Sequence, residues 1–274
     1  MNKKRLTDLI KSFLLFCILI IFLIPFLMII LNTFKTTQQF IENPLSWPTQ
    51  FDLSNYIKAF NDMDFAKGFV NSAVITIAGV FLIVLCSSMT AYLFARFKWK
   101  INKVLFFMML AAMTVPFQVI MIPLVTIYGK AKLLDSRPIL LFMYTGFGIP
   151  FATFTFHGFI KGIPLELEES AAIDGCSRLR TFFQIVLPLL KPALSTVVVL
   201  DVLWIWNDYL LPSLIIQSPK LRTLPLSNYN FFSSYSVDYS PLMAGIVMTI
   251  IPVLLLYIFL QKHIIEGITD GALK

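Results

Sequence analysis

Residues 161–191 read KGIPLELEESAAIDGCSRLRTFFQIVLPLLK, and this segment lies between two long apolar runs. It is much longer than the ~2–8 residues that usually connect two packed helices, so we expect it to form structure of its own. Pro164 suits the first turn of a helix, and Gly175 suits the left-handed residue that ends one. Three acidic residues favour the positive N-terminal end of this helix: Glu166, Glu168 and Glu169.

A second short helix is predicted in the same segment, from about Ser177 to Val186. Pro188 and Pro192 follow and are expected to break it, because proline cannot donate a backbone hydrogen bond. The two helices together would form a compact helix-turn-helix on a membrane surface. By itself this geometry indicates a docking platform, and an amphipathic connector that only lies on the membrane is the alternative.

The composition places the chain among membrane proteins. Of its 274 residues, 58% are hydrophobic and 14% are charged, whereas a soluble domain carries about 25% charged residues. The net charge of +7 is therefore attributed first to membrane topology and not to nucleic-acid binding. The three cysteines, Cys17, Cys86 and Cys176, are odd in number and have no metal-ligand spacing, so no disulfide framework is implied.

Six apolar runs are long enough to cross a hydrocarbon layer of about 30 Å, which takes about 20 residues. They are Ser12–Leu31, Val70–Phe94, Val104–Tyr128, Pro138–Ile160, Ala193–Ile216 and Leu242–Leu260. The first run follows three basic residues like a signal peptide, but it is too long and no small-residue cleavage site follows, so we interpret it as a retained span. The predicted fold class is all-α, a polytopic membrane protein with six transmembrane helices in a single domain over residues 1–274.

Basic residues set the predicted orientation, because they accumulate on the cytosolic side. With a cytosolic N-terminus, fourteen of the 22 basic residues fall on inner segments: Lys3, Lys4, Arg5, Lys11, Arg96, Lys98, Lys100, Lys103, Lys161, Arg178, Arg180, Lys191, Lys262 and Lys274. Lys130, Lys132 and Arg137 lie on the outer side and argue weakly the other way. Both termini are predicted to be cytosolic.

The 161–191 segment resembles the EAA motif of binding-protein-dependent ABC transporter permeases. The match runs from Glu169 to Gly175 (ESAAIDG) and, after nine residues, from Ile185 to Pro188 (IVLP); Ser170 departs from the usual alanine. The resemblance implies that this loop forms coupling helices that seat in a cleft of an ATPase subunit. The residues it assigns to coupling are Glu169, Ser170, Ala171, Asp174, Gly175, Ile185, Leu187 and Pro188.

Further matches are similar to the carbohydrate-type branch of that family, in particular to maltose-permease G-like subunits. They are Ala91–Phe97 (AYLFARF), Ile163–Glu169 (IPLELEE), Trp206–Pro212 (WNDYLLP), Leu221–Pro225 (LRTLP) and the tail Gly267–Lys274 (GITDGALK). The resemblance implies a type I ABC importer (MetI-like) fold in the bacterial cytoplasmic membrane. It also implies three partners: a second, F-like permease subunit, an ABC ATPase dimer, and an extracellular or periplasmic sugar-binding protein. A homodimer of this chain remains open.

Polar residues inside the spans are candidates for the substrate pathway, because an ionisable group in hydrocarbon costs about 2.5–3.5 kcal/mol on insertion scales. Asp201 and Asp208 are seven residues apart, which predicts one helix face with Trp204 between them. An aromatic ring beside carboxylates suits a sugar, and Asn207 adds an amide. The alternative is that these groups only hold neighbouring helices together.

Helix breaks are predicted in spans three and four, at Pro116 and Pro123 and at Gly146–Pro150. Gln118 and Tyr144 lie near these breaks and are further pathway candidates, with ordinary packing as the alternative. His157 is interpreted as a hydrogen-bonded interfacial residue. The outer connection Gln217–Pro241, with Tyr229, Phe231, Phe232, Tyr235 and Tyr239, is expected to face the binding protein; a plain solvated loop is the alternative.

The sequence has no phosphate-binding G-x-x-x-x-G-K-[ST], since its one Gly-Lys pair, Gly129–Lys130, precedes Ala131. No metal cluster or nucleophile-base pair stands out. The chain is therefore predicted to be non-catalytic, with no bound cofactor, metal or nucleic acid, while ATP and Mg bind to the partner ATPase. The predicted function is import of a mono- or oligosaccharide by alternating access. The alternatives are a glycerol phosphate or polyol importer, an ion-coupled secondary transporter, and a membrane-embedded enzyme.

Overall fold

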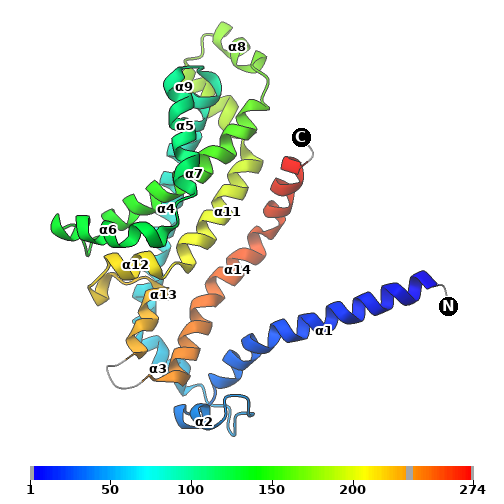
Figure 1. Cartoon of the computed structure of the whole chain (residues 1–274), viewed down its shortest axis with the longest axis vertical. Coiled ribbons are helices and arrows are strands. Elements are labelled where there is room, and N and C mark those ends of the chain that lie inside the picture. Colours follow the sequence, from blue (N-terminus) through cyan, green and yellow to red (C-terminus); the bar gives the residue numbers. More distant parts are fainter. Residues whose placement is uncertain (1–2, 233–236, 273–274) are drawn as a thin grey trace. The chain divides into compact units, whose positions relative to one another are not determined.

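The computed structural model describes residues 3–232 and 237–272. The described residues form helices and their connections (Figure 1). They also contain one isolated antiparallel bridge, between Phe232 and Val237. Their contacts divide the chain into two compact units. Tyr235, Leu273 and Lys274 lie outside the described residues, as do the side chains of Lys3, Lys4, Arg5 and Lys262.

The first unit comprises Met1–Ala66 and Ser227–Ile251. Its elements are α1 (Lys3–Asn32), α2 (Thr37–Glu42), α3 (Ser54–Asp62), a 3-10 turn at Asn228–Phe231 and the beginning of α14 (Tyr239–Ala272). The span predicted at Ser12–Leu31 lies within α1, whose apolar side chains are largely exposed.

Polar contacts hold the connections of this first unit in place. The Lys35 side chain is buried, and its Nζ donates to the carbonyl oxygens of Asn43 at 3.2 Å and Pro44 at 3.0 Å. Lys58 forms an ion pair with Asp238, which also accepts from the Thr37 hydroxyl at 2.7 Å. Burial acts to raise the pKa of Asp238, but the bonds from Lys58 and Thr37 outweigh it and lower that pKa.

The second unit comprises Lys67–Leu226 and Pro252–Lys274. Its longer helices are α4 (Phe65–Arg96), α5 (Lys100–Met113), α6 (Phe117–Lys130), α7 (Arg137–Lys161) and α11 (Lys191–Asn207). Its short elements are α8 (Glu166–Ile173), α9 (Arg178–Thr181), a π-helical turn (Phe182–Val186), α10 (Leu187–Leu189), α12 (Leu210–Ile215), a 3-10 turn (Pro219–Leu221) and α13 (Leu224–Ser227).

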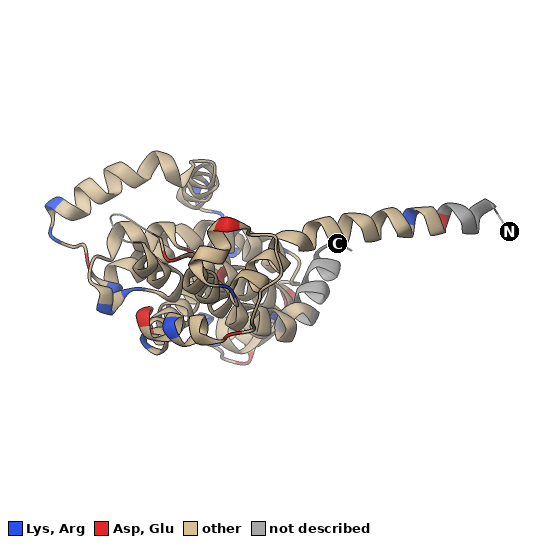
Figure 2. Cartoon of the chain, turned by 90° about the horizontal axis from the view of Figure 1, so that it is seen from below, with Lys and Arg blue, Asp and Glu red and all other residues tan. Residues whose placement is uncertain are grey.

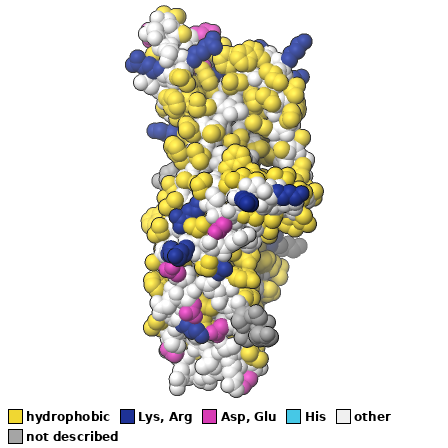
Figure 3. Space-filling model, turned by 90° about the vertical axis from the view of Figure 1, so that its left-hand side faces the viewer, with side chains coloured by type: hydrophobic (Ala, Val, Ile, Leu, Met, Phe, Trp, Pro, Cys, Tyr) yellow, Lys and Arg dark blue, Asp and Glu magenta, His cyan; other side chains and the backbone are white. Residues whose placement is uncertain are grey.

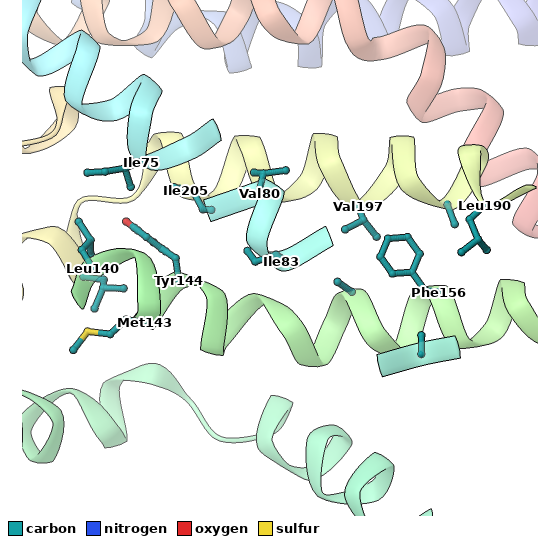
Figure 4. Packing of buried hydrophobic residues seen from close by; sticks show 14 of the residues in the cluster. Ile75, Val80, Ile83, Leu140, Met143, Tyr144, Phe156, Leu190, Val197 and Ile205 are labelled. Atoms are coloured by element: carbon teal, nitrogen blue, oxygen red, sulfur yellow. The ribbon is translucent and has the colours of Figure 1, made fainter. Parts of the chain in front are cut away.

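The core of the second unit is formed by α4, α7 and α11 (Figure 4). Ile83 of α4, Tyr144 of α7 and Ile205 of α11 are among its buried side chains. The helices α4 and α7 approach closely at Gly148, where a Cβ would overlap the side chain of Ile83. A small residue at this position therefore sets how near the two helices can lie.

Four helices are long and apolar enough to cross a membrane, in agreement with the first, second, fourth and sixth predicted spans. These helices are Asp8–Asn32, Phe65–Arg96, Arg137–Lys161 and Tyr239–Phe259. Two further pairs of helices reach that length only as bent pairs, so the described residues allow up to six spans. Figure 2 shows charged residues mainly at helix ends and in connections, as a membrane protein requires.

The third predicted span, Val104–Tyr128, is divided into two helices, as the predicted break at Pro116 requires. The helices α5 and α6 meet at 101° across a short break. Pro116 is the N-cap of α6 in extended backbone, and the preceding residue is kept out of the helical region by the proline ring. The predicted break at Pro116 is thus confirmed, but Pro123 lies inside α6 and α7 runs unbroken through Gly146–Pro150.

The fifth predicted span, Ala193–Ile216, was wrong in its course. The helix α11 ends at Asn207, and Asp208 follows in extended backbone with φ −72° and ψ 125°. At its other end, α11 meets the helix Arg178–Leu189 at 77°. The chain therefore bends before α11 and leaves the helix at Asp208, because the Asp208 side chain caps the next helix instead of continuing this one.

Candidate functional site

The first helix of the 161–191 segment ends as its sequence predicts. Gly175 has φ +80°, a backbone conformation that costs other residues free energy. The amide of Gly175 donates to the Ala172 carbonyl at 3.1 Å, and that of Cys176 donates to the Ala171 carbonyl at 2.9 Å. This pair of bonds is a Schellman motif, which satisfies the last carbonyls of α8 and reverses the chain. The three predicted glutamates occupy the first turn, although α8 begins at Glu166, after Pro164.

The helix α8 is attached to the end of α4 through one carboxylate. Glu168 accepts from Arg96 Nε at 2.7 Å and from the Tyr92 hydroxyl at 2.6 Å. Arg96 Nη2 also donates to the Ile163 carbonyl at 2.9 Å. The Arg96 and Glu168 side chains are only 12% and 9% exposed, so water weakens this ion pair less than it would an exposed one. A movement of α8 is therefore expected to act directly on α4.

The opposite side of α8 is open. Ile173 is 87% exposed at the end of this helix. Glu169, Ser170, Asp174 and Gly175 are exposed as well, while Ala171 is buried. The Ser170 hydroxyl donates to the Glu166 carbonyl at 2.8 Å and so does not project from the helix for another partner. The Ile173 side chain is therefore accessible to another protein.

The second helix of the segment begins at its predicted cap, but it ends later than predicted. The Ser177 hydroxyl accepts from the Arg180 amide at 3.4 Å. From Arg178 the chain remains helical through the π-helical turn to Leu189, with Pro188 near the start of α10. Of the predicted coupling residues here, Ile185 and Leu187 are half-buried and Pro188 is exposed. Val186 was therefore the wrong end for this helix, since the chain stays helical past Pro188, which directly follows the π-helical turn and Leu187.

Span residues predicted for the substrate pathway come together around Asp208. Its Oδ2 accepts from the buried Tyr144 hydroxyl at 2.9 Å, and its Oδ1 accepts from the Leu210 amide at 2.9 Å. The ring of Trp204 meets that of Tyr144 edge to face, with 5.5 Å between centroids. Asp208 and Trp204 line one cavity of about 220 Å³ together with Phe117, Phe147 and other apolar residues.

Asp201 lies within α11, whereas Asp208 follows the end of that helix in extended backbone, so the predicted common helix face does not reach Asp208. Asp201 is 4% exposed, and its Oδ2 has no hydrogen-bond partner among the described residues. Together with Trp204 and Phe147 it lines a neighbouring cavity of about 330 Å³. The Trp204 side chain thus borders both cavities, and each cavity has one carboxylate.

The remaining pathway candidates do not join this cluster. Asn207 is exposed, and its amide donates to the Leu203 carbonyl of its own helix at 2.8 Å. Gln118 is exposed in the first turn of α6. His157 is half-buried with its ring 4.3 Å from that of Phe106, so aromatic packing describes it better than the predicted interfacial hydrogen bond.

Sequence reasoning missed Tyr92 and Arg96 as functional residues. Both lie in the Ala91–Phe97 match, four residues apart, and so on one face of α4. That spacing was the available signal, but the sequence could not show which acidic residue of the connection they would contact. The described residues contain no group of three or more His, Cys, Asp or Glu side chains that could hold a metal ion.

Comparison with known proteins decides the family. The family described as binding-protein-dependent transport system inner membrane component matches residues 83–270. The chain belongs to this family. A probable permease for starch degradation products, AmyC of Thermoanaerobacterium thermosulfurigenes, is 41% identical to this permease over the full length of both chains. The multiple sugar-binding permease MsmG of Streptococcus mutans is 35% identical over 93% of each chain.

A solved structure supports the fold of the permease. It is a chain of a bacterial ABC transporter involved in the import of the acidic polysaccharide alginate. The TM-score is 0.80 at 21% identity, and the match covers 96% of this chain and 98% of that one. The predicted all-α importer fold and the resemblance to sugar permeases are thus confirmed, and the permease is a multi-pass membrane protein.

Proposed function

We propose that this permease is one of two transmembrane subunits of an ATP-driven importer that carries a mono- or oligosaccharide into the cell. The sugar assignment is supported by the names of its relatives, which include transport permeases for starch degradation products and for multiple sugars. The partners would be a second, F-like permease subunit, an ATPase dimer that binds ATP and Mg, and an external sugar-binding protein. Both termini would be cytosolic.

One observation carries the mechanism: α8 is bound to α4 on one side through Glu168 and is open on the other, where Ile173 is exposed. ATP binding closes the ATPase dimer and moves the docked α8, and α8 pulls on α4 through Glu168 and Arg96. The spans then open outward to receive sugar, and hydrolysis returns them inward. The permease itself performs no chemistry in this cycle. Ligands shift such an equilibrium only by differential affinity for its two states.

The cavities at Trp204 would form part of the path for the sugar. An indole ring can stack on the apolar C–H face of a sugar, and carboxylates accept hydrogen bonds from its hydroxyl groups. Trp204 has Asp208 in one adjoining cavity and Asp201 in the other. Successive contacts of this kind allow passage without tight binding.

The test is uptake by the complete transporter in proteoliposomes with ATP inside. A panel of oligosaccharides, monosaccharides, polyols and glycerol phosphate identifies the substrate class, and uptake of glycerol phosphate or a polyol alone would replace the sugar assignment. Gly175→Val should abolish uptake and leave membrane insertion intact, because a β-branched side chain strains a backbone at φ +80°. Gly162→Val is the matched control, since Gly162 lies in the same segment at φ −81°. Normal uptake by the Gly175 variant would contradict the coupling role of α8.

A further inference from the structure

A crevice lies between the α4–α5 turn and the end of α7, apart from both the coupling helix and the pathway cavities. It has a volume of about 460 Å³. Four lysines line it together with aromatic residues: Lys98, Lys100, Lys103 and Lys161. We call it the lysine crevice. Nothing in the proposed transport cycle uses it.

The lysines of this crevice are not neutralised by any side chain that the structure describes. Among the described residues, no acidic side chain forms an ion pair with any of the four lysines, and three of them occur within six positions of the sequence. Like charges so close together repel, so the arrangement costs free energy unless an anion compensates it. The crevice is therefore electrostatically prepared for a negatively charged group.

The turn that carries the lysines has a fixed shape. The Asn102 side chain is buried, and its amide donates to the carbonyl oxygens of Phe97 at 2.8 Å and Leu93 at 3.4 Å. These bonds close the end of α4 onto the start of α5. The lysines therefore project from a rigid turn, which lowers the entropic cost of binding a ligand.

The rest of the crevice is apolar and aromatic. Phe94, Phe106 and Phe107 form its wall, and Trp99 lies at the turn with 57% of its surface exposed. Phe107 is 56% exposed. Figure 3 shows basic side chains at the upper end of one side of the molecule, above a broad hydrophobic surface. A basic rim over an aromatic wall fits a molecule with an anionic head and a hydrocarbon tail.

We propose that the lysine crevice binds an anionic phospholipid of the inner leaflet. The lysines would bind the headgroup phosphate, and an acyl chain would lie along Phe106 and Phe107. Trp99 would sit at the interface, where its amphipathic ring is favoured. The assignment rests on the proposed topology, in which the α4–α5 turn faces the cytosol. Basic crevices between spans on that side are suited to such headgroups.

The experiment uses the purified transporter complex in nanodiscs of equal parts phosphatidylglycerol and phosphatidylcholine. Native mass spectrometry measures how much phosphatidylglycerol the complex retains. Lys100→Gln/Lys103→Gln should weaken retention on the order of tenfold, given the contribution of each lysine near an anionic surface. The matched control is Lys130→Gln/Lys132→Gln, which removes two exposed lysines from the end of α6 and should retain the lipid. Lys100→Arg/Lys103→Arg should also retain it.

Several outcomes would overturn the proposal. Equal retention by the glutamine variant, or equal loss in the control, would mean that no specific site exists. Displacement of phosphatidylglycerol by inorganic phosphate alone would assign a free anion in place of a lipid. Loss of the ATPase with unchanged lipid retention would assign the lysines to a protein partner. If the double variant does not insert, Lys161→Gln in α7 provides the same test with a severalfold expected loss.

The proposal and the transport function can fail separately. ATP-driven uptake in vesicles of phosphatidylcholine alone tests transport without the anionic lipid. Uptake together with unchanged lipid retention by the glutamine variant would remove the lipid site and leave the importer assignment in place. If lipid retention depends on the lysines but no tested solute is taken up, the lipid site stands and the importer assignment fails.

Discussion

Single polar residues in the apolar interior explain much of how the second unit is organised. Asp208 has both carboxylate oxygens in use, one for Tyr144 and one for the start of α12. Asp201 has one oxygen without a partner among the described residues. A buried carboxylate without a partner is costly, so we expect substrate or the second permease subunit to supply the missing contact.

Tyr144→Phe tests whether the Asp208 cluster contacts the substrate. The substitution keeps the ring and removes one hydrogen bond, a loss of about 1 kcal/mol. We expect a severalfold change in the KM of uptake at unchanged protein abundance, because Asp208 Oδ2 loses its fixed partner. Tyr128→Phe is the control, since no described residue is hydrogen-bonded to the Tyr128 hydroxyl. A lower thermal stability with unchanged KM would favour the packing interpretation.

Glu168→Gln tests the attachment of α8 to α4. The variant keeps the shape of the side chain but loses the charge that binds Arg96, a change of about 2 kcal/mol for a charge-assisted pair of low exposure. We expect ATP hydrolysis to continue while uptake falls at least severalfold. The measurement is the ratio of sugar transported to ATP hydrolysed in proteoliposomes.

Glu166→Gln is the matched control for that experiment. Glu166 lies in the same first turn of α8 and is exposed. The Glu166→Gln variant should transport as much sugar per ATP hydrolysed as the parent protein does. If both variants have the same ratio, the Glu168 contact does not transmit force.

At the scale of the elements, close helix contacts limit how α4 and α7 can move. A Cβ at Gly148 of α7 would lie 2.4 Å from Cδ1 of Ile83 in α4, so no larger residue fits without a shift. Gly146 lies two residues earlier in α7, and a Cβ there would meet nothing within 4 Å. The same helix therefore offers one crowded glycine and one open one.

Gly148→Val is expected to destabilise the permease by about 1–3 kcal/mol, the usual cost of overpacking a close contact. Gly146→Val should have a much smaller effect, because the position is open and valine has a higher helix propensity than glycine. Thermal unfolding of the two purified variants in detergent makes the comparison. Equal melting temperatures would contradict the close approach of α4 and α7.

The elements also show where prediction from sequence succeeded and where it failed. Length and hydropathy located the long spans, and the Gly175 turn followed from backbone chemistry. Proline chemistry predicted the break of the third span at Pro116, but the end of α11 at Asn207 could not be predicted, because an apolar sequence continues beyond Asp208 to Ile216. Asp208 looked like a span residue for this reason, although its carboxylate caps α12. The Glu168–Arg96 contact joins residues far apart in the chain, which periodicity cannot pair.

For the whole molecule, the proposed topology places the 161–191 segment in the cytosol. Cys176 is half-buried in this segment, whereas Cys17 and Cys86 lie within α1 and α4. One native thiol can therefore report which side of the membrane carries the segment.

A membrane-impermeant maleimide should label Cys176 in inside-out vesicles but not in right-side-out vesicles. Bound ATPase should slow this labelling, since α8 would then be covered. Cys176→Ser identifies the labelled residue. Labelling from the outside would reverse the topology and contradict both the coupling role and the inner-leaflet lipid site.

The π-helical turn at Phe182–Val186 has a consequence for how family members are compared. A π-turn holds about one residue more than an α-turn. Each residue of an α-helix rotates the following side chains by about 100°, so deleting one residue here would turn α9 by that angle about the axis relative to α10. A correct alignment with any permease that is regularly α-helical at this point must place a one-residue gap between Arg178 and Leu187.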